Sequence, residues 1–317
     1  MNYIVFDLEW NQSPAGKKYA NSKIPFEIIE IGAVKLNEER KIVDRFQCLI
    51  KPQVYNWIHE NIHEVIHVNY RDLRRGKTFS QAVEEFFKWC GEDYVFFTWG
   101  NQDLTELQRN MKFYNILELL PGPVKYYDLQ KIASNYYDDG TLRRALEYMV
   151  DKCGIEKKKG FHRALSDAYY TAEILKKLDM NYVFTNYSVD VFQNPKSKKE
   201  ELYLSYPTYD KFISREFVSK EAIMSDREVI STRCPVCKLA AKRKIRWFIS
   251  NSKIYYSISS CPEHGYIEGK IRIRKTEDEK YYAMKYLRCV DIEEAGEIRQ
   301  KREAIRMKRQ QKKNVNK

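Results

Sequence analysis

The sequence has no apolar run of the roughly 18 to 20 residues that a membrane-spanning helix needs. Its first residues, MNYIVFDLEW, show neither a charged leader nor a small-residue cleavage site. The seven cysteines are an odd number, and three of them stand in short metal-like spacings, which disfavours a disulfide framework. No repeat of fixed period is present. We therefore expect a cytoplasmic protein with no membrane partner.

Positive charge and aromatic rings are abundant instead. The chain has 56 Lys and Arg against 44 Asp and Glu, a formal charge of +12, which favours a polyanionic partner. Aromatic residues make up 14%, enough to build a core and to leave rings for stacking on bases. A merely soluble basic surface is the alternative. The length of 317 residues favours two domains.

Hydrophobic periodicity predicts an α/β or α+β domain over residues 1–182, because strands come first and helices follow. Residues 3–10, 27–36, 42–50 and 94–98 read as strands. Residues 80–90, 104–114, 128–137, 141–153 and 164–178 have the spacing of helices.

The rest of the chain divides by composition. Residues 183–228 are polar, rich in tyrosine and interrupted by proline, so we expect a linker with partial structure. Residues 229–290 contain cysteines and a predicted β-hairpin. Residues 291–317 are expected to form a basic helical tail.

Two carboxylates stand two residues apart in the first predicted strand. Successive strand residues alternate faces, so Asp7 and Glu9 point the same way, about 7 Å apart. Adjacent carboxylates on one face repel unless cations neutralise them, and oxygen donors suit Mg²⁺ or Mn²⁺. A solvated polar face is the alternative for this pair taken alone.

Two further acids follow. Asp103 comes directly after a predicted strand, at the opening of a helix, where the helix dipole favours an acid. Asp167 lies on a helix whose apolar residues are expected to face the core. His162 precedes it by five residues, so it can reach the same site only from the loop that enters the helix.

The motifs FDLEWN, PFEIIEIGAV, WGNQDLTEL and HRALSDA occur in this order. They resemble the DEDDh branch of the ribonuclease H-like, DnaQ-like exonucleases over residues 1–180. The insertion before EIIEIGAV, the following FQCLIKP and WGNQD are similar, more narrowly, to the histone-mRNA 3' exonuclease and KapD-like branch. The resemblance implies an α/β fold with a mixed five-stranded sheet, three strands antiparallel and the next parallel, flanked by helices.

By this resemblance Asp7, Glu9, Asp103 and Asp167 hold two Mg²⁺ or Mn²⁺ ions. His162 is then the general base, since histidine side chains titrate near neutral pH. A catalytically inactive relative is the alternative.

The chain departs from its relatives at IHEVIHVNYRDLRR, where they have a small-residue segment. Nearby His59, His63 and His67 are spaced by four and could share a helix face as metal ligands, but surface or packing histidines are the commoner case.

Two knuckles, Cys234-Pro-Val-Cys237 and Cys261-Pro-Glu-His264, supply four ligands for one structural zinc ion. With a hairpin between them they resemble a zinc ribbon, which predicts a small β-rich domain that needs its metal to fold. Free cysteines are the alternative, and Cys289 could replace His264 as the fourth ligand.

Expected contacts to nucleic acid combine cations with rings. They are Trp10 in the first domain and Lys242, Arg243, Lys244, Arg246 and Trp247 around the knuckles, with Phe248, Tyr255 and Tyr256 as further rings nearby. The basic tail is expected to add non-specific attraction for phosphates, although a solvated terminus would look the same. A ribbon can also bind protein.

These features predict a 3'-5' exonuclease that trims single-stranded nucleic acid, RNA in preference to DNA, to nucleoside 5'-monophosphates. The RNA preference rests on the resemblance alone. The alternatives are a DNA exonuclease on the same scaffold, a nucleic-acid-binding protein that does not cleave, and a ribbon-mediated protein scaffold.

Overall fold

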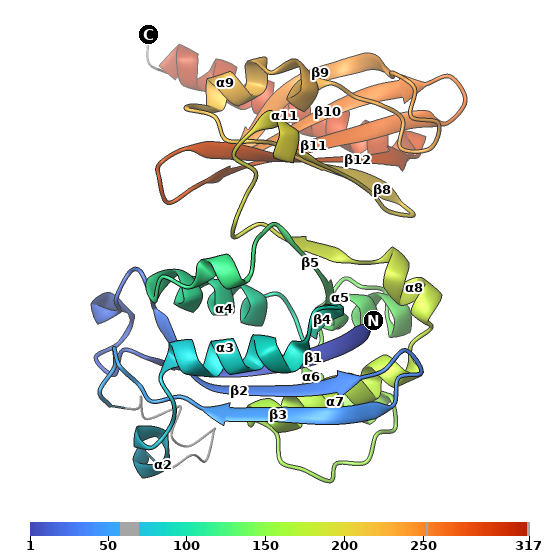
Figure 1. Ribbon diagram of the computed structural model, residues 1–317. Helices are drawn as coiled ribbons and strands as arrows, with labels where there is room; N and C mark the ends of the chain where they lie inside the picture. The colour runs from blue at the N-terminus through green and yellow to red at the C-terminus, as the bar shows by residue number, and fades with distance from the viewer. Residues whose placement is uncertain (58–69, 252, 316–317) are drawn as a thin grey trace. The chain divides into compact units, whose positions relative to one another are not determined.

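The computed structural model in Figure 1 describes residues 1–57, 70–251 and 253–315. The predicted helix face with His59, His63 and His67 lies outside these residues. Within the described ranges, no helix is long and apolar enough to cross a membrane.

The chain divides into two compact units, Met1–Gln193 and Asn194–Lys317. Each unit contains one six-stranded sheet. The division falls after the boundary expected at residue 182, because residues 183–193 complete a helix and add a strand to the first unit.

The first unit contains β1 (Asn2–Gln12), β2 (Phe26–Leu36), β3 (Ile42–Leu49), α2 (Tyr70–Arg74), α3 (Phe79–Cys90), β4 (Tyr94–Thr98), α4 (Gln102–Phe113), β5 (Val124–Asp128), α5 (Leu129–Tyr137), α6 (Leu146–Lys152), α7 (Ala164–Lys177), α8 (Met180–Thr185) and β6 (Ser188–Asp190). Two short 3-10 turns, Lys17–Tyr19 and Leu117–Leu119, also belong to it.

The first sheet has the strand order β3-β2-β1-β4-β5-β6. β2 is antiparallel to both of its neighbours, β1 and β3, and β4 and β5 run parallel to β1. This confirms the mixed α/β sheet, but the expected number of five strands is wrong. β6 is a sixth strand, antiparallel to β5, and it comes from the predicted linker. With three residues it is too short to show a periodicity.

Both faces of the first sheet are covered by helices. α3 and α4 pack on one face with side chains such as Phe86 and Leu107, against Phe6 of β1. α5, α6 and α7 pack on the other face, where Val5 of β1 meets Ala168. β1 is therefore buried on both sides and carries a mostly apolar sequence, as a central strand must.

The second unit contains β7 (Leu202–Ser205), β8 (Tyr209–Ile213), α9 (Lys220–Ser225), α10 (Arg227–Ile230), β9 (Lys242–Asn251), β10 (Ile254–Cys261), β11 (Gly265–Lys275), β12 (Tyr281–Val290) and α11 (Ile292–Val315), besides the 3-10 turn Lys198–Glu200. Its strands are antiparallel, in the order β7-β8-β12-β11-β10-β9.

The interpretation of residues 183–228 as a linker is corrected by the structure. This stretch supplies the end of α8 and all of β6 to the first unit, and β7, β8, α9 and the start of α10 to the second. Its fully buried apolar residues are few: Val183, Ile213 and Ile223. β8 pairs with β12, about 70 residues further along the chain, so no local pattern could have indicated the pairing. The expected ribbon over residues 229–290 is thus part of a larger sheet.

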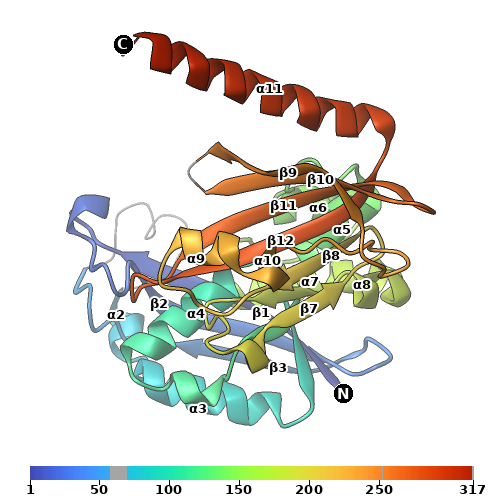
Figure 2. The same ribbon diagram turned by 90° about the horizontal axis from the view of Figure 1, so that it is seen from above.

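α11 extends the chain as a helix of 24 residues, in agreement with the expected helical tail. Its first turns are docked, because Ala295 and Ile298 are buried against Ile245 and Ile258 of the sheet. Figure 2 shows α11 as one long helix that runs from the end of β12 toward the C-terminus.

Candidate active site and metal-binding cluster

β1 places Asp7 and Glu9 on one face of the first sheet, because successive strand side chains point to opposite sides. Phe6 and Leu8 point to the other side, into the core with α3 and α4. Trp10, expected to contact nucleic acid, packs partly buried against that core, just after a β-bulge in the pairing of β1 with β2.

α7 brings Asp167 to the carboxylates of β1. The helix passes so close to β2 that a Cβ on Gly32 would lie 2.0 Å from the backbone nitrogen of Leu165. One oxygen from each of Asp7, Glu9 and Asp167 lies within 4.8 Å of the other two. Three acids from positions 7, 9 and 167 therefore form one group that could hold a metal ion.

Asp103 lies beside this group rather than within it. It is 5% exposed, in the first turn of α4, and its Oδ1 accepts a hydrogen bond from the backbone N–H of Leu8, 3.3 Å away. Its charge raises the pKa of both Asp7 and Glu9. The fourth acid thus contributes to the same electrostatic site from the α3 and α4 side of the sheet.

Burial is the main cause of raised pKa values in all four acids, and their mutual repulsion adds to it. The pKa of Asp7 lies well above its usual range. Burial raises the pKa of Glu9 to about 8, of Asp103 to about 7 and of Asp167 to about 6. Such a cluster is fully ionised near neutral pH only when cations bind to it.

The two carboxylate oxygens of Asp167 differ in their surroundings. Asp167 Oδ2 accepts a hydrogen bond from the backbone N–H of His162, 3.1 Å away. Asp167 Oδ1 is buried and has no hydrogen-bond partner among the residues that the structure describes. A buried oxygen left unpaired is costly, so this atom fits a coordinated cation.

His162 lies in the loop that enters α7, as its spacing from Asp167 predicts. Its φ of 63° places the backbone in the left-handed region, which is unusual for a residue other than glycine. The side chain is exposed. The backbone turn therefore ties the loop to Asp167 while the imidazole remains accessible to a substrate.

The structure adds two residues that the motifs did not single out for a role. Glu30 lies opposite Glu9 in the pairing of β1 with β2 and is 1% exposed. Its two carboxylate oxygens accept hydrogen bonds from Arg163, each 3.1 Å long, and one also accepts from Gln47. A charged residue flanked by apolar residues of a buried strand is the sequence signal that could have revealed Glu30.

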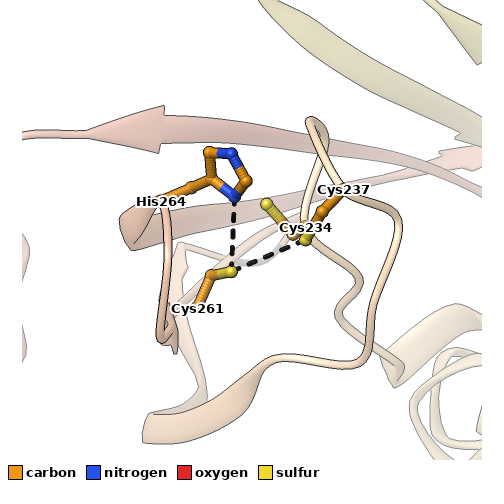
Figure 3. Close-up of side chains that lie close together, drawn as sticks. All are labelled: Cys234, Cys237, Cys261 and His264. Atoms are coloured by element: carbon orange, nitrogen blue, oxygen red, sulfur yellow. Dashed lines mark hydrogen bonds between the residues drawn. The ribbon is translucent and has the colours of Figure 1, made fainter.

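The second cluster joins the two predicted knuckles. Figure 3 shows Cys234, Cys237, Cys261 and His264 pointing toward a common centre. Their ligand atoms lie within 4.8 Å of one another, and Cys261 Sγ is 3.6 Å from both Cys237 Sγ and His264 Nδ1. Sulfurs bound to a tetrahedral zinc at about 2.3 Å lie about 3.8 Å apart, so this arrangement fits zinc.

Backbone donors around the knuckles favour thiolates. Burial by itself would raise the pKa of Cys234. Hydrogen bonds from the backbone N–H groups of Cys237 and Val236 outweigh burial and lower the pKa. The His264 side chain and nearby N–H groups likewise lower the pKa of Cys261. Cys289, the alternative ligand, packs beside the cluster but is not among its four members.

The expected contacts in the second unit fall into two groups. Trp247 is partly buried with α9 and α10, and its Nε1–H donates to the carbonyl of Ile230 at 2.8 Å. The exposed cations are Lys242, Arg243, Lys244 and Arg246.

Comparisons with known proteins agree with this geometry. A family model described as Exonuclease, of the RNase T type, matches residues 4–175, more than half of the chain. The match includes all four acids and His162. The second unit lies outside it.

Two curated relatives each match just over half of the chain. The chain is 30% identical over 174 residues to the DNA polymerase III PolC-type of Clostridium perfringens, across 55% of this chain but 11% of that protein. It is 27% identical over 190 residues to the DNA polymerase III subunit epsilon of Aquifex aeolicus, across 56% and 79% of the two chains. The chain thus spans only about a tenth of the first relative.

Among solved structures, the nuclease domain of 3'hExo, a DEDDh family member bound to rAMP, superposes with a TM-score of 0.50. The identity is 20%, over 60% of this chain and 96% of that one. At this identity the likeness concerns the fold, and it identifies the first unit as a ribonuclease H-like exonuclease fold.

Proposed function

Because the chain belongs to the Exonuclease family, whose model spans residues 4–175, we propose that it is a 3'-5' exonuclease. It removes nucleotides from the 3' end of single-stranded nucleic acid by hydrolysis and releases nucleoside 5'-monophosphates. The observation that carries the proposal is the convergence of Asp7, Glu9 and Asp167, whose ligand oxygens lie within 4.8 Å of one another.

The four acids hold two Mg²⁺ or Mn²⁺ ions in this proposal. The unpartnered Oδ1 of Asp167 and the raised pKa values of Glu9 and Asp103 support it, since both are features that a bound cation relieves. Once bound, the ions would stabilise the negative charge that develops on the scissile phosphate.

His162 acts as the general base. It accepts a proton from the attacking water and holds it on the imidazole while the phosphodiester bond breaks. Its exposed side chain and the tie of its backbone to Asp167 support this role, because they hold an accessible imidazole next to the acids.

The zinc cluster has a structural role in this proposal. One Zn²⁺ held by Cys234, Cys237, Cys261 and His264 joins two knuckles separated by 23 residues. All four positions are taken by protein ligands, which leaves no open coordination position for chemistry.

RNA is the preferred substrate in this proposal, on the basis of the resemblance to the histone-mRNA 3' exonuclease branch. A DNA exonuclease is the second candidate, because both curated relatives are named as parts of DNA polymerase III. Matched RNA and DNA oligonucleotides, degraded side by side with Mg²⁺ or Mn²⁺, distinguish the two. Faster turnover of DNA overturns the preference for RNA.

The activity is tested with 5'-labelled, 3'-labelled and 3'-blocked single-stranded oligonucleotides. We expect stepwise shortening from the 3' end, early release of the 3' label as a mononucleotide, and no reaction on the blocked strand. Asp7→Asn and His162→Ala should each reduce the rate by on the order of 10³-fold, the equivalent of about 4 kcal/mol.

Asp278→Asn is the matched control, because it removes an exposed acid of the second unit. Tight binding of the oligonucleotide by the wild type with no cleavage would identify a nucleic-acid-binding protein instead. Equal rates for the Asp7 and Asp278 variants would contradict the assignment of the site.

A further inference from the structure

One face of the second sheet carries a row of alternating cations and rings. The strand registers place Lys211 opposite Tyr286, Tyr286 opposite Lys270, Lys270 opposite Tyr256 and Tyr256 opposite Phe248. We call these five residues the cross-strand row. Neighbouring strands lie about 4.8 Å apart, so the row spans four spacings, or about 19 Å.

Close approaches between cations and rings show that neighbouring members of the row face one another. The Nζ of Lys211 lies 5.8 Å from the ring centre of Tyr286, and the Nζ of Lys270 lies 5.5 Å from that of Tyr256. α11 adds Lys301, whose Nζ is 4.3 Å from the Tyr256 ring. Cations and aromatic faces therefore alternate across the sheet and meet the basic helix.

The row connects two hollows of the surface. Tyr286 and Lys270 line a cavity of about 570 Å³, together with Tyr209 and Arg272. Phe248 lines a second cavity, of about 350 Å³, between β9 and α11. Three arginines of α11 border this second cavity: Arg302, Arg306 and Arg309.

The described residues of this face carry more cations than acids, and Glu294 of α11 pairs there with Arg288. Arg272 and Arg274 are exposed at alternate positions of β11, on the same side as Lys270. Glu268 is the acid that the alternation of β11 places on this side, and it is largely buried in an ion pair with Arg288 of β12. A polyanion would thus meet cations along the whole row.

We propose that the cross-strand row binds single-stranded nucleic acid, with a base stacked on Tyr286 and phosphates held by Lys211 and Lys270. Tyr256 and Phe248 are partly buried against the apolar contact between the sheet and α11. Such alternation of rings and cations suits a single strand, since each base offers a flat face and each phosphate a charge. The inference rests on the proposed function for the class of polymer. It assigns the second unit a strand-holding role outside the catalytic unit.

This surface shares Phe248 and Tyr256 with the contacts expected around the knuckles, but it does not include Trp247. Trp247 packs with Tyr255, α9 and α10, on the side of the sheet opposite Tyr256. Its ring lies over Gly269, where an added Cβ would come 2.5 Å from the indole. Trp247 therefore stabilises the sheet. The proposal assigns the base-stacking role that the sequence suggested for Trp247 to the row.

The test measures fluorescence anisotropy of a labelled 30-nucleotide strand bound to the full chain, with Asp7→Asn present in every protein to prevent cleavage. We expect Lys270→Ala and Tyr286→Leu each to weaken binding about ten-fold. Leucine keeps an apolar side chain at a partly buried position, so the sheet should still fold. Tyr286→Phe keeps the ring and should bind as tightly as tyrosine.

Salt dependence separates the two kinds of contact. Loss of one phosphate contact lowers the slope of log affinity against log salt by about 0.7 for single strands. Lys270→Ala should show this reduction. Tyr286→Leu should weaken binding at every salt concentration and leave the slope unchanged.

Two controls decide the location. Lys253→Ala removes an exposed cation of the same unit at the β9–β10 turn and should bind like the reference. If the row variants bind the strand with the same affinity as Lys253→Ala, the proposal is overturned. It is also overturned if affinity falls only in the double variant Lys242→Ala with Lys244→Ala.

Hydrolysis of the same strand by the chain with Asp7 intact is measured in parallel. Binding that depends on the row without any hydrolysis refutes the proposed exonuclease activity and supports the row. Hydrolysis together with unaltered binding in the row variants refutes the row alone.

Discussion

Arg163 holds the buried carboxylate of Glu30 with two parallel hydrogen bonds, from Nε and Nη2, each 3.1 Å long. The pair adjoins the acid cluster, because Glu30 raises the pKa of Glu9 and Asp167 while Arg163 lowers that of Glu9. Arg163 also directly precedes α7 and follows His162. The pair therefore neutralises one buried charge and anchors the loop that carries His162, the proposed general base.

Arg163→Lys should reduce exonuclease activity about ten-fold or more, because lysine cannot reproduce the planar two-bond contact and the loop loses its position. The rate on a short oligonucleotide measures this. Arg109→Lys is the control, since the Nε of Arg109 donates to both carboxylate oxygens of Glu106 in α4. Equal losses in both variants would show that the effect is one of general stability.

Gly32→Ala should displace α7, because the added Cβ would lie 2.0 Å from the backbone of Leu165. We expect the first unit to lose about 3 kcal/mol of unfolding free energy. Activity should fall further than stability explains, since α7 carries Asp167. Denaturant unfolding and the hydrolysis rate are the measurements. Gly296→Ala, with no atom near its Cβ, should leave both unchanged within about 1 kcal/mol, and a tolerated Gly32→Ala would contradict the close packing.

The stability of the first unit without divalent ions should fall as the pH rises from about 5 to about 8.5. Carboxyl groups with raised pKa values bind protons more tightly in the folded state than in the unfolded one. The stabilisation of the first unit by these groups is complete when the pH is below the ordinary carboxyl pKa. It is lost as the pH rises through the pKa values of the folded state, about 6 for Asp167, 7 for Asp103 and 8 for Glu9.

Amide hydrogen exchange of β1, with and without Mg²⁺, measures this effect. Mg²⁺ should restore stability, and more so at higher pH, because it binds the ionised acids. Glu9→Gln should flatten the metal-free profile above pH 7. A stability that rises over this range would argue against a cluster held together by cations.

Cys261→Ser should abolish zinc binding, which we expect at one ion per wild-type chain. A structural zinc contributes about 10 kcal/mol or more, comparable with the whole stability of a domain, so the second unit should unfold. The first unit has its own core and should remain folded. Metal analysis and thermal unfolding are the measurements.

Cys289→Ser is the control for the zinc ligands. Cys289 packs beside the cluster without belonging to its four ligands, so the variant should keep its zinc. If Cys289→Ser loses the ion while His264→Ala retains it, the fourth ligand is Cys289.

Local patterns predicted the elements that carry the candidate site. The strand with Asp7 and Glu9 and the helix with Asp167 follow from apolar residues at intervals of two and of three to four. The spacing of His162 from Asp167 already required a loop position, and the structure has one. β5 and β6 escaped prediction, because a five-residue strand and a three-residue strand show too little periodicity.

The sequence by itself determined which residues are available for chemistry: acids within strongly periodic elements and two knuckles with the spacing of zinc ligands. Only the tertiary structure decided which other residues they contact. It brought Arg163 to Glu30, joined β8 to β12 and turned Trp247 away from the row. Periodicity records which face of one element is buried, whereas strand pairing and ion pairs between distant residues depend on how the whole chain packs.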